Sequence, residues 1–554
     1  MRLKIIFSLF YFASLAVIAQ PANETRAVWI ATNFRLDWPP PVYNEQTQKK
    51  ALTDILDNLL QKNFNTVYFQ VLFNGTSLYK SRLLPMSYYI SGVTGDTNTY
   101  DPLAFAVDEC HKRGLEIHAW INTLRCFTGT ENFVRENPKH VMSLHKDWIV
   151  EKFIDGQTTY WLDAGLPQVR NYLIDISNEL INNYDIDGLQ FDFLRYPSTD
   201  FNDSKSFGLF GKKSDRDNWR RENINLIVKK VHELIEEEKP FVKFGVTPIG
   251  IYKNQSGAKG LQGFSDVYQD TKLWLSNGWI DYATPQIYWN FNDNPKFDIV
   301  ANDWKENSFG RNIVLGIAAY KNDVVKEIDK MINYSRKINA SGLAFFRYSN
   351  IKDVEIRSFS EKSFPAKMDW KDNEPPDEIS TLTADVDEKN KVILSWNIPE
   401  NSVNTSDIFY TAIYKLNSEK ENPSPTNLLK LTKVTNKSIR FFIGNPANLK
   451  YYFALKTLDR FWNESLVRSN IVEVKIPALT ETFEKFKEKH KPIFVRDEND
   501  NIIFVTYSFS KRLIQFQFEN STENQSANLL PGINLVKLEK KNIELNSIKV
   551  IYPE

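Results

Sequence analysis

The stretch Tyr184-Asp185-Ile186-Asp187-Gly188-Leu189-Gln190-Phe191-Asp192-Phe193-Leu194-Arg195-Tyr196-Pro197 is the most informative part of this sequence. Its apolar-rich run has the length of a buried strand and is interrupted by one carboxylate, Asp192. An unpaired charge is costly to bury. The presence of Asp192 is explained if the carboxyl end of this strand opens into a site, because catalytic groups of (β/α) barrels sit at that end of the strands. We interpret Asp192 as a catalytic carboxylate; the alternative is a structural Asp paired with Arg195.

Strand-like and helix-like segments alternate on both sides of this stretch, from Arg26 to about Tyr348. The predicted strands are Ala27–Ala31, Thr66–Val71, Glu116–Trp120, Gly188–Asp192, Lys243–Thr247, Tyr282–Ile287, Ile313–Ile317 and Leu343–Phe346. The predicted helices between them are Gln46–Gln61, Pro102–Arg113, Pro167–Tyr184, Asp217–Glu238, Ser265–Asn277, Asp298–Lys305 and Val324–Lys337. Eight strands with intervening helices predict an α/β fold, a (β/α)8 TIM barrel.

The pattern changes after residue 365. We expect a barrel over 20–365 and a charged, Pro-bearing linker over 366–376. Short strands without a clear helix follow, of which 391–399 and 451–459 are the best defined, so the chain should end in all-β sandwich-type domains. Residues 377–476 resemble a fibronectin type III module, with Trp396 in the core and Tyr451 at a tyrosine corner. Residues 477–554 should form a small β-rich C-terminal domain, with strands at 501–507 and 512–518. Because separate cores can fold apart, residues 375–554 should be dispensable for the chemistry.

The first residues have the pattern of a secretory signal peptide. Two positive charges, Arg2 and Lys4, precede an apolar run from Ile5 to Ile18 that is too short to span a membrane. Ala19 then offers a small residue for cleavage. We expect residues 1–19 to be removed and the protein to be secreted, periplasmic or on the cell surface. No other stretch is long and apolar enough to cross a bilayer.

Composition narrows the functional classes. Lys+Arg and Asp+Glu are both 69, so no net charge draws the chain to nucleic acid. Two cysteines exclude a disulfide scaffold and disfavour a Cys-based metal site. No metal or cofactor is expected, because the histidines do not form a ligand pattern and no Gly-rich phosphate loop or Ser/His/Asp signature is present.

Polar and aromatic side chains recur where other predicted strands end. They are Gln70, His118, Trp120, Asn122, Gln286, Tyr288 and Trp289. Aromatic faces pack on sugar C–H faces, and amides bond hydroxyls in pairs, so a polysaccharide or oligosaccharide is the expected partner. Singly, each residue is weak evidence: a Trp is as often packing as stacking, and a lone His is more often structural. Their recurrence at strand ends is the signal.

Glycoside cleavage usually needs two carboxyl groups flanking the bond. Asp192 is the first, and the candidates for the second are Asp37, Asp163 and Asp270. Asp163 precedes a predicted helix and could merely cap it, and Asp270 could pair with a base. Arg195 would bind a sugar carboxylate or keep Asp192 ionised, or it forms a plain ion pair. We predict Asp192, Asp37 and Asp163 as the catalytic set.

Several blocks of sequence carry a family resemblance. They are residues 26–29, 64–71, 100–105, 111–120, 187–197, 243–251, 279–282 and 285–289. Together they resemble the bacterial glycosyl-hydrolase-like family ten, the group of YngK-type proteins. The resemblance implies a (β/α)8 glycosidase fold, and a peptidoglycan glycan stripped of stem peptides as the substrate class. Many relatives carry two consecutive acids after the apolar strand; here Phe193 replaces the second.

The expected function is therefore a secreted glycoside hydrolase that cleaves a bacterial polysaccharide, of which peptidoglycan-type glycan strands are the favoured example. An alternative is a non-catalytic, carbohydrate-binding cell-surface protein built on a glycosidase-like barrel, since no second acid is clear. An enzyme acting on another acidic polysaccharide differs only in substrate.

Overall fold

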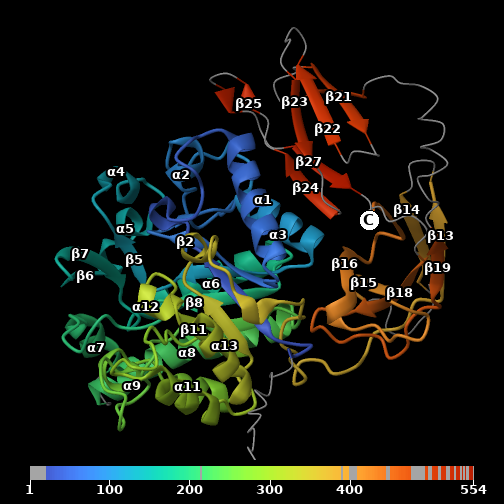
Figure 1. Ribbon diagram of the computed structural model, residues 1–554. Coiled ribbons are helices and arrows are strands. Elements are labelled where there is room, and N and C mark those ends of the chain that lie inside the picture. Colours follow the sequence, from blue (N-terminus) through green and yellow to red (C-terminus); the bar gives the residue numbers. More distant parts are fainter. Residues whose placement is uncertain are drawn as a thin grey trace, which may run out of the picture.

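Eight parallel strands form a closed barrel in the computed structural model (Figure 1). The structure describes residues 20–211, 215–387, 391–398, 408–443 and 450–475, and gives backbone strands between 493 and 552. The barrel strands are β1 (Thr25–Ile30), β2 (Thr66–Phe73), β4 (Glu116–Asn122), β8 (Gly188–Asp192), β9 (Lys243–Val246), β10 (Tyr282–Ala283), β11 (Asn312–Ile317) and β12 (Gly342–Phe345). Strand β1 pairs with both β12 and β2, which closes the sheet and confirms the TIM barrel.

All eight predicted strands are present, and their residues are buried throughout, as expected of parallel strands covered on both faces. Strand β10 is shorter than predicted, two residues where the pattern gave six. Pro285 follows Thr284 and lacks the N–H that a ladder needs. Beyond it, Gln286 makes only isolated bridges to Ile249 and Gly316.

Helices cover the outside of the barrel. They are α1 (Glu45–Gln61), α3 (Pro102–Arg113), α6 (Pro167–Asn183), α8 (Arg216–Glu238), α10 (Thr271–Ser276), α11 (Phe297–Glu306) and α13 (Ile328–Lys337). Helix α3 shows why the ends fall where they do: Asp101 accepts a hydrogen bond from the Ala104 N–H at its start, and Gly114 ends it at a φ of +69°.

Two predicted helices are interrupted. Residues 265–277 divide into α9 (Gly263–Asp266) and α10, with Tyr268 between them at a φ of +62°. The Tyr268 hydroxyl is held by Asp217 and Arg220. Residues 324–337 divide into α12 (Asn322–Val325) and α13. In the first case tertiary contacts override the apolar spacing.

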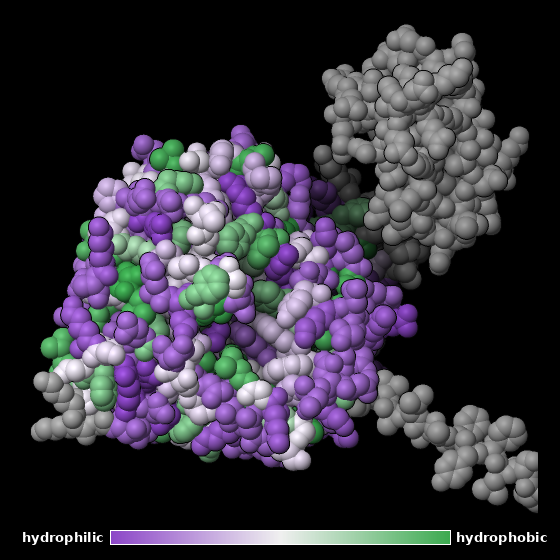
Figure 2. All heavy atoms as spheres, turned by 90° about the vertical axis from the view of Figure 1, so that its left-hand side faces the viewer, coloured by the Kyte–Doolittle hydropathy of each residue, from purple (hydrophilic) through white to green (hydrophobic). Residues whose placement is uncertain are grey.

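The connections after the barrel strands carry most of the short elements, of which α2, α4, α5, α7 and the strands β5 to β7 are labelled on the left in Figure 1. They are η1 (Asn33–Arg35), β3 (Thr76–Ser77), α2 (Tyr88–Ser91), β5 (Arg125–Thr128), α4 (Asn132–Arg135), α5 (Val141–Leu144), η2 (Lys146–Trp148), β6 (Ile149–Ile154), β7 (Gln157–Leu162), α7 (Ser204–Phe210) and α14 (Tyr348–Ile351). Strands β5, β7 and β6 make a small antiparallel sheet between β4 and α6. Figure 2 views this face, where hydrophobic residues are scattered in small groups among hydrophilic ones.

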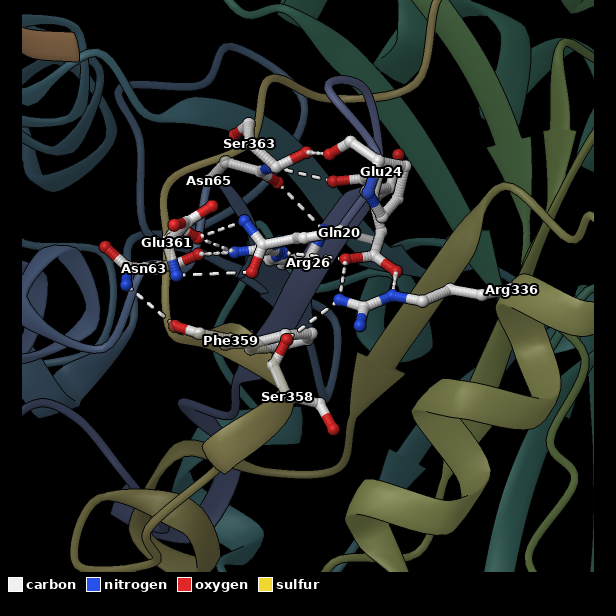
Figure 3. A network of polar contacts seen from close by, with 12 residues as sticks. Gln20, Glu24, Arg26, Asn63, Asn65, Arg336, Ser358, Phe359, Glu361 and Ser363 are labelled. Atoms are coloured by element: carbon white, nitrogen blue, oxygen red, sulfur yellow. Dashed lines mark hydrogen bonds and ion pairs between the residues drawn. The ribbon is translucent and has the colours of Figure 1, made fainter. Parts of the chain in front are cut away.

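An ion network joins the start of the barrel to its end (Figure 3). Glu24, just before β1, accepts hydrogen bonds from Arg26 and from both Nε and Nη2 of Arg336 on α13. Arg26 also donates to the backbone carbonyl of Glu361, which follows η3 (Arg357–Phe359). Burial lowers the pKa of Arg26 to about 10, and the Glu24 charge opposes this. The network ties β1 to the segment that follows β12.

Two antiparallel sheets follow the barrel. One contains β13 (Thr381–Val386), β14 (Val392–Asn397) and β17 (Ser438–Phe441); the other contains β16 (Leu428–Lys433), β15 (Tyr410–Leu416), β18 (Lys450–Leu458) and β19 (Val472–Lys475), with η5 (Pro425–Asn427) before β16. Trp396 and Tyr451 lie in the core that the two sheets share. The strands predicted at 391–399 and 451–459 correspond to β14 and β18.

The loop after β18 covers the amino-terminal end of the barrel. The Trp462 indole donates a hydrogen bond to Glu116 at 2.6 Å and stacks on Phe364 and Tyr410. Arg460 forms an ion pair with Asp185, and Phe461 lies in the same apolar cluster as residues of the barrel interior. Glu116 also contacts Lys243, so a buried ion pair lies beneath Trp462. We call residues 460–462 the plug.

The remaining strands are antiparallel. Strands β20 (Ile493–Arg496), β21 (Ile502–Ser508), β22 (Leu513–Phe518) and β23 (Asn524–Asn528) form one sheet, and β24 (Gly532–Val536) with β27 (Ile548–Tyr552) and β25 (Glu539–Lys540) with β26 (Ile543–Glu544) form two pairs. Strands β21 and β22 match the two predicted there. Within the described residues no helix is long and apolar enough to cross a membrane, and Cys110 and Cys126 are free and buried.

Candidate active site

Asp192 is the last residue of β8, so its carboxylate lies at the carboxyl end of the barrel. Its side chain is 6% exposed. Oδ1 accepts a hydrogen bond from the Phe193 N–H at 2.7 Å, and Oδ2 accepts one from the Trp120 indole at 3.2 Å. Phe193 has a φ of +54°, which few non-glycine residues adopt. The two bonds fix the carboxylate and use about half of its accepting capacity.

The surroundings of Asp192 act on its ionisation in opposite directions. Burial raises the pKa of the carboxyl, while the Phe193 N–H, the Arg125 and Arg195 charges and the Trp120 indole oppose that rise. A carboxyl with a raised pKa holds its proton closer to neutral pH, as a general acid must.

The charges of two arginines act on Asp192, one from the insertion after β4 and one from the loop after β8. The Arg125 guanidinium, at the start of β5, lies 3.5 Å from the centre of the Phe193 ring, and that of Arg195 lies 5.4 Å from the same ring. Neither guanidinium forms a hydrogen bond or an ion pair with any residue that the structure describes. Sequence reasoning found Arg195 and missed Arg125, although Arg125 follows the polar end of β4 by only three residues.

Gln70, three residues before the end of β2, lies next to Asn122, the last residue of β4. Gln70 Nε2 donates to Asn122 Oδ1 at 3.3 Å, and Gln70 Oε1 accepts from the N–H groups of Thr32 and Asn33. Asn122 is also in register with Asp192. The structure therefore brings Gln70, Asn122 and Asp192 together, and Gln70 holds the loop after β1 in place.

Trp120 contributes its indole N–H to Asp192 rather than an open ring face. The side chain is 3% exposed and belongs to the apolar cluster of the barrel interior, with Trp29 and Tyr68. Its placement favours a role in orienting the carboxylate over one in stacking on a sugar.

The segment after β10 supplies a half-buried aromatic wall. The Tyr288 ring lies 6.1 Å from that of Phe346 and 6.0 Å from that of Tyr320, which is half exposed. Burial raises the pKa of Tyr288 and the Asp192 charge adds to the rise, so the phenol lies near the carboxylate. Trp289 and Gln286 are also half-buried in this segment. Of these three residues, Tyr288 is the one whose interaction with Asp192 brings it into the site.

His118 lies in the barrel interior and not at the strand ends. It is 2% exposed, with Nδ1 2.6 Å from the Tyr282 hydroxyl oxygen and Nε2 3.4 Å from Glu116 Oε2. Burial lowers the pKa of His118 to about 4, although the Asp187 and Asp281 charges oppose this. The structure does not bring it to Asp192, and its placement favours a structural role.

The neutral His118 should make the fold sensitive to acid. Below pH 6.5 the unfolded chain binds a proton at this residue, whereas the folded chain does not until pH is near 4. Stability should therefore fall as pH falls through this window, by up to about 3 kcal/mol from this group. Melting temperatures measured from pH 7 to 4 should fall less steeply for His118→Gln than for the wild type. Parallel curves would mean that His118 titrates alike in both states.

The Asp37 carboxylate is enclosed. Oδ1 accepts from Arg347 Nη1 at 2.7 Å and from the Ser349 N–H at 2.9 Å, and Oδ2 accepts from the Ala31 N–H at 2.8 Å. The side chain has no exposed surface. This placement favours a role in joining the loop after β1 to the loop after β12.

The carboxylates of Asp163 and Asp270 also accept hydrogen bonds from neighbouring groups. Asp163 follows β7, outside the barrel strands; it accepts from the Gly165 N–H at 2.9 Å, and burial raises its pKa while a hydrogen bond from Ser206 opposes this. Asp270 accepts from the Tyr252 hydroxyl at 2.6 Å just before α10. Among the described residues no contact joins either of them to Asp192.

Two further features of the molecule bear on the location of the site. No group of three or more His, Cys, Asp or Glu side chains in the described part of the chain could hold a metal ion. A cavity of about 480 Å³ lies between α3 and β16 and is lined by Gly114, Leu431 and Trp462 among others. It is at the plug end of the barrel, so it is separate from the site at Asp192.

The family model and the two relatives of known name agree in their class. Residues 24–334 match the family described as glycosyl hydrolase-like 10. The chain is similar to glycosyl hydrolase YngK of Bacillus subtilis (strain 168), at 31% identity over 81% of this chain and 93% of that protein. It is 35% identical to glycosyl hydrolase DigH of Escherichia coli (strain K12) over 57% of this chain and 79% of DigH. The solved PgaB (BpsB) glycoside hydrolase domain from Bordetella bronchiseptica aligns with a TM-score of 0.44 at 11% identity, over 60% of this chain and 99% of that one.

Proposed function

Because this chain belongs to the glycosyl hydrolase-like 10 family, we propose that it is a glycoside hydrolase whose catalytic carboxyl is Asp192. The observation that carries this is the carboxylate itself: it ends a barrel strand and is held by two donors, with a pKa that burial raises. A protonated Asp192 would donate to the leaving oxygen, and its anion would then stabilise the positive charge that develops on the sugar.

The second catalytic group is the less defined part of the proposal. Of the three sequence candidates, Asp37 and Asp163 are the two in the predicted catalytic set, and the donors on their oxygens fit positioning roles better. We keep them as the residues to test first. Gln70, Asn122, Gln286, Tyr288, Trp289 and Arg195 are the proposed substrate contacts.

The proposed substrate is a bacterial glycan, with peptidoglycan-type strands favoured. The family resemblance of the sequence motivates this choice, and the half-buried aromatic and cationic side chains near Asp192 suit a sugar chain that carries acidic groups. The test is release of reducing ends from a panel of purified glycans. Cleavage of peptidoglycan strands but not of neutral chitin-type chains is expected, and no release from any glycan would reject the hydrolase.

A non-catalytic, carbohydrate-binding protein is the second candidate, and one observation favours it. Asp37 and Asp163 are enclosed and Asp270 is bound to Tyr252, so Asp192 lacks an evident partner among the described residues. Retention on a glycan without any product would select this function.

We propose the same division of the chain that its sequence indicates: residues 20–365, 366–376, 377–476 and 477–554. For the third part we propose a fibronectin type III-like module. Seven short strands in two antiparallel sheets over a shared core, with Trp396 buried between them, support it.

Export is proposed on residues 1–19, which lie outside the described residues. Expression of the full chain in a bacterial host should give a secreted or periplasmic protein whose first residue is Gln20, because Ala19 is the small residue before the expected cut. Mass spectrometry of the mature N-terminus checks this. A cytoplasmic product that still begins at Met1 would contradict the signal peptide.

A further inference from the structure

We propose that Arg125 and Arg195 form a carboxylate-binding subsite beside Asp192, so that the sugar bound there carries an acidic group. The inference rests on the proposed hydrolase function and names the class of its substrate. It starts from an imbalance of charge: two guanidinium groups act on one carboxylate, which leaves a positive charge without a counterion in the site.

The two arginines differ from the other enclosed arginines of the barrel. Arg220 donates to both oxygens of Asp203, to the Tyr268 hydroxyl and to two backbone carbonyls. Arg347 donates to Asp37 Oδ1. Arg125 and Arg195 instead have only the Phe193 ring, and no hydrogen bond or ion pair to any residue that the structure describes. None of their nitrogen atoms is both buried and without a partner, so these donors are open to solvent and can reach a ligand that binds beside Asp192.

Phe193 contacts both Arg125 and Arg195 without using their hydrogen-bond donors. Its ring lies 3.5 Å from the Arg125 guanidinium and 5.4 Å from that of Arg195, so it supports both cations by cation–π contact without neutralising either. Their donor forks remain free for an oxygen pair. Trp161 packs against the same ring and fixes it from the inserted sheet.

The charge of the site favours a carboxylate over a dianion such as phosphate. Burial lowers the pKa of both guanidinium groups, and Asp192 opposes this. When Asp192 is ionised, one further monoanion balances the two cations and its carboxylate, and a carboxylate accepts a guanidinium fork bidentately. The acid can be the lactyl ether of a muramic acid or the carboxyl of a uronic acid. Muramic acid and uronic acid present the same carboxylate, so glycan substrates that contain one or the other are needed to distinguish the two sources.

The first experiment compares glycans that differ only in that group. Strands containing muramic acid, and a uronic acid polymer, are each assayed before and after reduction of their carboxyls to alcohols. The wild type should cleave one native glycan at least tenfold more efficiently in kcat/KM than its reduced form, and the source that it cleaves identifies the acid. Equal rates on native and reduced strands would overturn the subsite and leave the hydrolase intact.

Matched variants assign the effect to the arginines. Arg125→Gln should reduce the preference for native strands to about threefold or less, mainly through KM. Arg357→Gln, which removes an exposed guanidinium, should leave it unchanged. Phe193→Asp would place a carboxylate between the cations and should abolish the preference, whereas Phe193→Asn, of the same size, should retain more of it. If Asp and Asn act alike at this position, charge does not set the specificity.

Direct binding separates failure of the inference from failure of the function. Isothermal calorimetry with N-acetylmuramic acid, glucuronic acid and neutral N-acetylglucosamine needs no turnover. One acidic sugar should bind the wild type at least tenfold more tightly than the neutral sugar, and Arg125→Gln should remove that difference. If neither acidic sugar binds better than the neutral one, the subsite is rejected whether or not the protein cleaves glycan.

Discussion

Asp192→Asn should lower turnover by on the order of a thousandfold, because the amide can neither donate the proton nor carry the charge that the carboxyl supplies. The fold should survive. The Phe193 N–H still finds an oxygen, and burial already disfavours the ionised side chain, so the melting temperature should stay near the wild-type value or rise slightly. Turnover and melting temperature are to be measured on one preparation.

Asp37→Asn is the matched control. It removes the partner of Arg347 in a fully enclosed site, and breaking a buried pair costs about 3–5 kcal/mol. We expect a lower melting temperature with substantial activity left in the folded protein. The reverse pattern, an unstable but active Asp192→Asn and a stable but inactive Asp37→Asn, would transfer the catalytic role to Asp37.

Trp462→Ala should be the most destabilising single change. The side chain is 2% exposed, stacks on Phe364 and Tyr410, and donates to the buried Glu116. Removing a buried Trp costs about 3–5 kcal/mol, and here it also exposes the Glu116–Lys243 pair to the resulting cavity. A large fall in melting temperature is expected by calorimetry. Leu466→Ala, four residues further on and 82% exposed, should change it little.

The plug also changes what truncation should do. The sequence led us to expect that residues 375–554 are dispensable, but Phe461 and Trp462 complete the apolar end of the barrel. A protein ending at residue 365 should therefore melt lower than the full chain or be insoluble. If it melts at the full-length temperature and keeps its activity, the two parts fold independently and the plug is only a contact.

The barrel was predictable because buried parallel strands are nearly continuous apolar runs, and all eight runs are present in this sequence. The interruption of the helix predicted over 265–277 was not predictable. Its cause is the Tyr268 hydroxyl, which is held by Asp217 and Arg220, some 50 residues earlier in the chain. The enclosure of Asp37 was not predictable either, because its partner Arg347 lies 310 residues away in the sequence.

The residues of the site likewise divide into those that the sequence could predict and those that it could not. Asp192 stands out in the sequence because a carboxylate ends an apolar strand. His118 could have been placed from the strand period alone: it is four residues before the end of β4, which puts it about 13 Å below the strand end. Arg125 lies on an insertion, and its position over Phe193 depends on how that insertion folds back.

The plug has a consequence for the order of events during synthesis. Trp462 meets Glu116 across 346 residues of chain, so the base of the barrel stays open until more than 100 residues beyond its last strand have been made. Contacts this distant in sequence form late and slow a folding reaction. Until then the apolar residues around Ala27 and Met368 are open to other chains. Chains arrested before residue 462 should therefore aggregate more readily than completed ones.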